Sequence, residues 1–357
     1  MRQKNTSNNL MVIGNGFDIF HHLKTRYTDF VEFYTKKDNL ELITREFPEI
    51  KYLDEYTKEE VSIKNIVENN NWLILINRMR ENLDDRWCSL EEVIGNVIQK
   101  INEYDIKQKN NELDKKFIGD PADVIGSYLL GKTVYNRNYS CFEELAKVFS
   151  TDLKRLKFLL QRYLIFVYSN ALIEIDNNLK ELFISGYINH VLSFNYTKLV
   201  EDYYAPKNNA FDVCNIHGDL SDYNNMVFGT EKFIENERKI YNPFWKDNQR
   251  VINENDNAFL EWNKDGHFGI SIFFGFSFGL SDKRIIEYLY NKSQYLYIYC
   301  HSKKANEDIF GNIAMIIGKK EALEAVENKK IVFIKDLKNK VLKDALMTEA
   351  FLEGLME

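Results

Sequence analysis

Short apolar runs near the start and in the second half of the chain predict buried strands, and a long stretch with helical spacing separates them. Residues 10–13 are all apolar and are followed at once by Gly14 and Gly16, a pattern typical of a strand that ends in a tight turn. From 20 to 34 the apolar residues keep helical spacing. Further runs predict strands at 190–197, 210–219, 226–229, 268–277, 295–300 and 330–334, with helices at 285–291 and 307–317.

This alternation predicts an α/β fold: a doubly wound, mostly parallel, Rossmann-like sheet covered by helices on both faces. Between 36 and 186 we find no clear strand, although a crossover needs only about 10 to 12 residues. Polar stretches at 51–71 and 107–116 predict loops. We therefore expect a discontinuous nucleotide-binding core formed by 1–35 and 187–340, a large helical insertion or cap at 36–186, and a C-terminal helix at 341–357.

Sheets of this kind bind ligands beyond the carboxyl ends of their strands, so residues that follow the predicted strands are the candidate site. Glycines without a Cβ let the backbone approach a phosphate, and a helix that begins there points its N–H groups at the same place. The residues that we predict to bind a cofactor are Gly14, Asn15, Gly16, Phe17, Asp18, Gly275, Ser277 and Asp282.

Two further residues at strand ends have side chains suited to catalysis. His217 precedes Gly218, and a histidine with its ordinary pKa of about 6.5 can accept a proton from a hydroxyl or a water. Asn195 offers both a donor and an acceptor, so it can hold a water or a ribose hydroxyl. Structural roles remain open for both, in a loop hydrogen bond and in a turn. Asp18 fits a ribose contact and a helix cap equally well.

Two other enzyme classes fit the pattern less well. Residues 275–279 read Gly-Phe-Ser-Phe-Gly, as in the nucleophile elbow of serine hydrolases. That reading needs an acid and then a histidine downstream, but His301 is the only later histidine, Asp282 is too close and Asp308 is out of order. A dehydrogenase fingerprint needs a third glycine where Ile19 stands. We therefore disfavour both hydrolysis by a serine nucleophile and hydride transfer.

Composition narrows the class of protein. The net charge is -7, with 47 Lys and Arg against 54 Asp and Glu, so there is no overall basic field to attract nucleic acid, and no carboxylate cluster indicates a nuclease. The four cysteines lie far apart without metal-ligand spacing, so we expect no metal site and a reducing, cytoplasmic location. The adjacent His21 and His22 cannot both face one site from a helix. No apolar run approaches the roughly 20 residues of a membrane span, and from the polar start we expect no signal peptide.

The order of these motifs resembles one protein family. The stretches 13–18, 23–30, 192–197, 216–218, 227–229 and 275–282 are similar to motifs of the bacteriophage abortive infection family AbiH. Trp87 and Glu91 match a further signature, in which Ser89 stands where the family often has aspartate. Phe276 stands where the family usually has histidine, so we expect no catalytic role there.

The resemblance implies an antiphage effector. The family is in turn similar to sirtuin-like NAD-binding proteins, which implies that 14–18 binds the pyrophosphate and ribose of NAD and that Asn195 and His217 take the catalytic positions. We expect hydrolysis of the nicotinamide glycosidic bond. The alternative is a non-catalytic sensor that binds NAD or ADP-ribose and acts through a partner of the helical insertion. The sequence leaves open the phage-derived trigger or partner protein, and whether the chain forms a homo-oligomer.

Overall fold

The chain forms two compact units. A computed structural model describes residues 8–46, 51–53, 58–82, 90–113, 123–135, 138–205, 211–231, 238–262, 266–336, 342 and 344–346. The sheet unit comprises Met1–Lys24, Asn170–Asp219 and Asn253–Glu357. The helical unit comprises Thr25–Ser169 and Leu220–Ile252, so it also takes in a stretch that we assigned to the nucleotide-binding core. Most of the predicted C-terminal helix lies outside the described residues.

The described residues of the sheet unit form six parallel strands, which confirms the prediction of a doubly wound α/β fold. They are β1 (Leu10–Ile13), β4 (His190–Ser193), β5 (Asp212–Asn215), β6 (Phe268–Phe274), β7 (Ser293–Tyr299) and β8 (Ile331–Ile334). Their spatial order is β5-β4-β1-β6-β7-β8. Counted along the chain this is 3-2-1-4-5-6, the order of Rossmann folds, in which the direction of winding reverses between β1 and β6.

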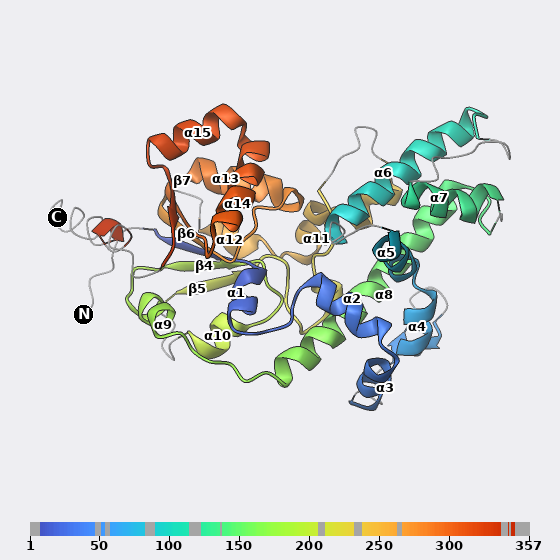
Figure 1. The fold of residues 1–357 in the computed structure, drawn as a ribbon, viewed down its shortest axis with the longest axis horizontal. Coiled ribbons are helices and arrows are strands. Elements are labelled where there is room, and N and C mark those ends of the chain that lie inside the picture. The colour runs from blue at the N-terminus through green and yellow to red at the C-terminus, as the bar shows by residue number, and fades with distance from the viewer. Residues whose placement is uncertain are drawn as a thin grey trace. The chain divides into compact units, whose positions relative to one another are not determined.

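Helices cover both faces of this sheet. Figure 1 shows α13, α14 and α15 on one face and α1, α9 and α10 on the other. The helices of the unit are α1 (Asn15–Phe20), α9 (Asn177–Ile184), α10 (Leu199–Tyr203), α12 (Asn257–Glu261), α13 (Lys283–Lys292), α14 (Lys303–Ile317) and α15 (Lys319–Glu327), with a 3-10 turn, η5, at Leu280–Asp282. Because both faces are covered, every residue of β1 is at most 2% exposed.

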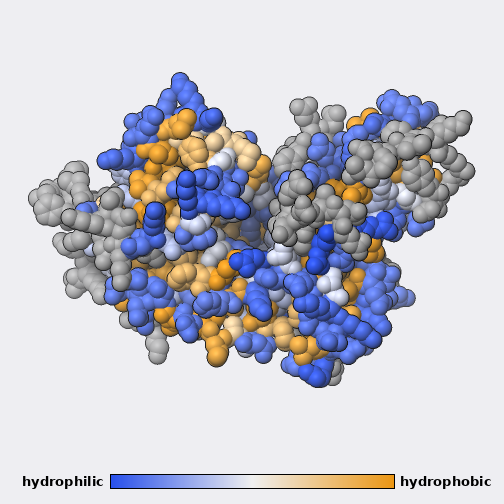
Figure 2. All heavy atoms as spheres, viewed as in Figure 1, coloured by the Kyte–Doolittle hydropathy of each residue, from blue (hydrophilic) through white to orange (hydrophobic). Residues whose placement is uncertain are grey.

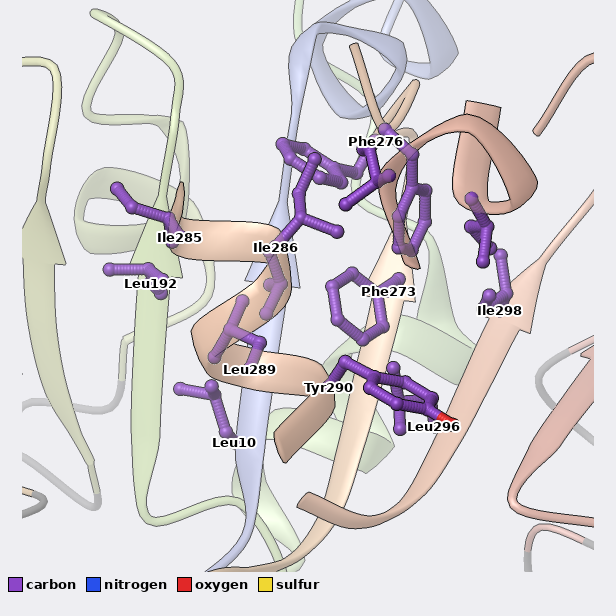
Figure 3. Close-up of a cluster of buried hydrophobic side chains, with 14 of the residues drawn as sticks. Leu10, Leu192, Phe273, Phe276, Ile285, Ile286, Leu289, Tyr290, Leu296 and Ile298 are labelled. Atoms are coloured by element: carbon purple, nitrogen blue, oxygen red, sulfur yellow. The ribbon is translucent and has the colours of Figure 1, made fainter. Parts of the chain in front are cut away.

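The main core of the sheet unit lies between α13 and the strands. Figure 3 shows the strand residues Leu10, Leu192, Phe273, Leu296 and Ile298 together with Ile285, Ile286, Leu289 and Tyr290 of α13. Full burial of one such side chain contributes about 1.5 to 3 kcal/mol. This core holds the strands in place and thereby fixes the loops that follow their carboxyl ends.

The helical unit is built mostly from α-helices. It contains α2 (Tyr27–Thr35), α3 (Lys37–Glu46), α4 (Ile63–Asn69), α5 (Asn71–Asn82), α6 (Leu90–Lys109), α7 (Val124–Leu130), α8 (Phe142–Ser169) and α11 (Lys246–Asn253), a π-turn η2 (Gly131–Tyr135) and 3-10 turns η3 (Tyr223–Asn225) and η4 (Lys239–Phe244). The strands β2 (Tyr52–Leu53) and β3 (Glu60–Val61) form a short antiparallel hairpin.

Two predictions of loops were wrong in the helical unit. Residues 51–71 contain the β2–β3 hairpin and α4, whose N-terminus is capped by Ser62 accepting from the backbone N–H of Asn65 at 3.2 Å. Burial of Ile63 and Ile66 outweighs the polar composition of that stretch. The loop predicted at 107–116 begins later, because α6 continues to Lys109.

The strand predicted at 226–229 was also wrong. The Gln249 side chain accepts from the Phe228 N–H at 3.0 Å and donates to the Phe228 carbonyl at 2.9 Å, so both backbone groups bond to one side chain. Gly229 is required here, because a Cβ would lie 2.3 Å from the carbonyl oxygen of Phe244. The apolar residues of this stretch are thus buried in the helical unit without joining the sheet.

A buried ion pair lies in the same unit. The Lys246 ammonium is 2.7 Å from the Glu91 carboxylate, and the Lys246 side chain is 0% exposed. Glu91 stands in the first turn of α6, where the helix dipole favours a negative charge. Removal of either partner would leave the other charge buried, so this pair is expected to be important for the unit's stability.

The described surface is mixed in character. Among the described helices, none combines the length and the apolar composition needed to cross a membrane. Leu172, Val251 and Ile252 are the most exposed large hydrophobic residues, at 92%, 69% and 77%. Figure 2 shows hydrophobic residues interspersed with hydrophilic ones on the face in view. Single exposed hydrophobic residues are normal for folded proteins and do not by themselves indicate a binding surface.

Candidate functional site

The glycines after β1 and β6 contact each other at the point where the winding of the sheet reverses. Gly275 has a φ of +64°, and a Cβ there would lie 2.3 Å from the backbone nitrogen of Phe17. A Cβ on Gly16 would lie 2.5 Å from the Cα of Gly275. These glycines are therefore required for the close packing of two loops, whether or not a ligand also approaches them.

Part of the hydrogen-bonding capacity of this turn is already used within the protein. The Gly16 N–H donates to the Gly275 carbonyl at 2.8 Å, and the Phe17 N–H donates to the Gly14 carbonyl at 2.8 Å. A phosphate at this turn would need other donors. Phe17 is 0% exposed and packs against Phe183, Tyr204 and Phe274, whereas Asn15 is exposed. The assignment of 14–18 to NAD stays a prediction; within this stretch Asn15 is exposed and Gly16 half-buried, whereas Gly14, Phe17 and Asp18 are buried.

Asp18 forms a buried polar cluster with residues that follow β4. Its Oδ1 accepts from Asn195 Nδ2 at 2.9 Å, and the Thr197 hydroxyl lies 2.9 Å from both carboxylate oxygens. Asp18 is 2% exposed, Asn195 4% and Thr197 3%. Burial raises the pKa of Asp18 from its ordinary 3.8 to about 7, although the hydrogen bonds from Thr197 and Asn195 act in the opposite direction. Asp18 therefore changes charge near neutral pH.

His217 is paired with Asp282. His217 Nε2 lies 3.0 Å from Asp282 Oδ1, and the two residues are 5% and 6% exposed. His217 follows β5, and Asp282 ends the η5 turn that follows β6. When Nε2–H donates to the carboxylate, a neutral imidazole carries its lone pair on Nδ1 and can act as a base there. We predicted both residues for the site but not their contact with each other.

The aromatic residues on either side of Asn195 lie close to the His217 ring. The Phe194 ring meets the imidazole edge-on, with centroids 5.0 Å apart, and the Tyr196 ring is 6.2 Å away. Segments that follow four strands, β1, β4, β5 and β6, thus supply Asp18, Asn195, His217 and Asp282 to the carboxyl edge of the sheet. Paired titratable groups at the carboxyl edge of such a sheet are typical of a catalytic or binding site.

The loop after β6 supports the site through its packing. Phe276 is 6% exposed and packs on Phe194, with ring centroids 4.5 Å apart. Ser277 is exposed, and its carbonyl accepts from Asn312 at 2.9 Å. The next element is a 3-10 turn and not the helix that a nucleophile elbow requires. Phe278 is 1% exposed with a φ of +55°, a strained conformation for a residue with a side chain.

The two adjacent histidines after β1 have separate environments. His21 is 2% exposed, with Nδ1 2.7 Å from the Phe17 carbonyl and Nε2 2.5 Å from the Tyr204 hydroxyl, and burial lowers its pKa. His22 is exposed, with a φ of +63°. His21 therefore joins α1 to the residues after α10. Within the described parts of the chain, no group of three or more His, Cys, Asp or Glu side chains is placed to hold a metal ion.

Thr197 is the residue of the site that we did not predict. Thr197 lies two positions after Asn195 and, like it, is a polar residue at the end of a predicted strand. That position was the signal by which the sequence could have identified it.

Most of the sequence matches the model of one known protein family. The family model described as "Bacteriophage abortive infection AbiH" matches residues 10–300. The match begins at the first residue of β1 and ends just after β7, so it contains every residue of the site described above. No curated protein sequence matches the chain.

Proposed function

Because the chain belongs to the bacteriophage abortive infection AbiH family, which implies a role in phage abortive infection, we propose that it binds NAD beside His217 and hydrolyses the nicotinamide glycosidic bond. The observation that supports this most directly is the buried His217–Asp282 pair beyond the carboxyl ends of a Rossmann-like sheet. Dinucleotides commonly bind at this edge of such sheets.

In the proposed reaction, a water attacks C1′ of the nicotinamide-bearing ribose while the C–N glycosidic bond breaks. The bonding electron pair goes to the pyridine nitrogen, so nicotinamide leaves as a neutral molecule. His217 Nδ1 accepts a proton from the attacking water or from a ribose hydroxyl, and Asp282 stabilises the imidazolium that forms. Asn195 holds the water or hydroxyl. The products are nicotinamide, ADP-ribose and one proton.

The test is release of nicotinamide from NAD by the purified full chain, followed by chromatography. We expect His217→Ala to lower the rate about 100-fold, within the range usual for a general base, and Asp282→Asn to lower it at least tenfold. His301→Ala is the matched control, because that histidine is exposed, and its rate should equal that of the unmodified chain. Undiminished release by His217→Ala would exclude the assigned role.

One observation favours a sensor that binds NAD or ADP-ribose without cleaving it. Asn195 and His217 are only 4% and 5% exposed, which leaves little room for an attacking water. A sensor would show a rise in melting temperature with NAD or ADP-ribose, no nicotinamide release, and weaker binding in Asn195→Ala. Its partner, a protein or a phage-derived trigger, would then transmit the signal.

A further inference from the structure

We propose that Asp18 is a positioning residue that fixes the side-chain amide of Asn195, so that Asn195 presents its oxygen and not its nitrogen to the ligand. The identity of that ligand as NAD rests on the proposed function, whereas the orientation of the amide does not. This role differs from the two that the sequence left open for Asp18, a direct ribose contact and a helix cap.

With Asp18 ionised, the geometry allows one orientation of the amide. The carboxylate then has only acceptors, so the group that lies 2.9 Å from Asp18 Oδ1 must be the NH₂ end of Asn195. Reversal of the amide would place two acceptors against each other where both residues are at most 4% exposed, and unpaired buried polar atoms are strongly unfavourable. Thr197 cannot relieve such a clash, because its single hydroxyl hydrogen is directed to the same carboxylate.

A consequence for the ligand follows from this orientation. The opposite end of the Asn195 amide is Oδ1, an acceptor, and the partner of an acceptor must be a donor. A hydroxyl or a water meets that requirement, and a phosphate oxygen does not. His217 also presents an acceptor, because its Nδ1 accepts a hydrogen bond when Nε2–H donates to Asp282. We therefore expect this part of the site to take a hydroxyl-bearing portion of the ligand, with the phosphates elsewhere.

A first experiment measures the amide itself, without NAD. In the full chain labelled with ¹⁵N-asparagine, the Asn195 side-chain signals are identified by their absence from Asn195→Asp. We expect slow exchange of these hydrogens with solvent, and at least tenfold faster exchange in Asp18→Ala. Glu307→Ala on α14, whose side chain is 65% exposed, should leave the exchange unchanged. Should Asp18→Ala fail to fold, Asp18→Asn keeps the side-chain size and should still raise the exchange rate, because an amide accepts less strongly than a carboxylate.

A second experiment asks whether Asp18 acts through Asn195. NAD binding and nicotinamide release are compared for Asp18→Ala, Asn195→Ala and the double variant. We expect each single substitution to lower the NAD affinity and the rate of nicotinamide release at least tenfold. The double variant should lie no more than about threefold below the more impaired single variant, because the effects of coupled residues are not additive. Losses that multiply would show that Asp18 contacts the ligand directly and would overturn the proposal.

The two experiments separate the inference from the proposed function. If the unmodified chain neither binds nor cleaves NAD, the proposed function fails and the exchange measurement alone decides the orientation. Exchange that is equally fast in the unmodified chain and in a folded Asp18→Ala would overturn it.

Discussion

Replacement of the buried Asp18 carboxyl by an amide should change how the stability of the sheet unit depends on pH. The pKa of Asp18 is raised to about 7 in the folded chain, against 3.8 for an ordinary aspartate. Between these values the folded state holds a proton that the unfolded state releases. The contribution of Asp18 to stability is therefore fully present below pH 4 and is lost as the pH rises through 7.

The size of this change in the free energy of unfolding follows from the difference between the folded and unfolded pKa values of Asp18. One pH unit corresponds to about 1.4 kcal/mol, so the whole interval from 3.8 to about 7 is worth roughly 4 kcal/mol. Most of it falls between pH 5 and pH 8, and over that range we expect roughly 2 to 3 kcal/mol. Asp18→Asn cannot titrate, so its free energy of unfolding should rise by that amount relative to the unmodified chain as the pH increases from 5 to 8.

The assay must follow the sheet unit by itself, because two units need not unfold together. Trp262 is the one tryptophan of the sheet unit and stacks on His190 at 4.4 Å. Incorporation of 5-fluorotryptophan gives it a separate ¹⁹F signal, identified by Trp262→Phe, that can be followed through urea denaturation. The reasoning would be refuted if the free energies of unfolding of Asp18→Asn and of the unmodified chain differed by an amount that stays constant within about 0.5 kcal/mol from pH 5 to pH 8.

Two further predictions concern packing and charge. Gly275→Ala should destabilise the sheet unit by roughly 2 to 4 kcal/mol, because the φ of +64° and the Cβ at 2.3 Å from Phe17 are both unfavourable. Gly311→Ala on α14 meets nothing within 4 Å and should be neutral or stabilising by up to about 1 kcal/mol in the same ¹⁹F assay. Glu91→Ala should destabilise the helical unit by roughly 3 to 5 kcal/mol, because Lys246 is 0% exposed. Glu307→Ala, whose partner Lys303 is 92% exposed, should change stability by less than about 0.5 kcal/mol, as measured by thermal denaturation.

The sheet could be predicted from the sequence because its strands are buried on both faces. Continuous apolar runs mark β4, β6, β7 and β8, and their bounds differ from the predicted ones mainly where polar residues after the strand were included. The stretch 226–229 has the same apolar character but does not form a strand of the sheet. Its backbone bonds to Gln249, a residue about 20 positions later whose side chain no periodic pattern distinguishes.

The candidate site could be predicted as a set of residues but not as a set of contacts. The rule that ligands bind beyond the carboxyl ends of strands pointed to Asn195, His217 and Asp282. Their partners depend on loop conformation: the His217–Asp282 bond joins residues 65 positions apart, through loops whose course follows no hydrophobic period. The glycine pattern predicted a tight turn and a close approach to a ligand, but not that the loops after β1 and β6 need these glycines for their own backbone contact.

The central position of β1 also affects how the protein is made. β1 lies between β4 and β6, and the side chain of Asn9, just before it, accepts from the backbone N–H of Ile270, 261 residues later. At a synthesis rate of 5 to 20 residues per second, the ribosome needs roughly 13 to 50 seconds to deliver that partner. Throughout this time the apolar residues of β1 lack one neighbouring strand, and Asp282 has not yet been added. A nascent chain therefore cannot assemble the site until most of the protein has emerged, which delays any activity of the site until synthesis is nearly complete.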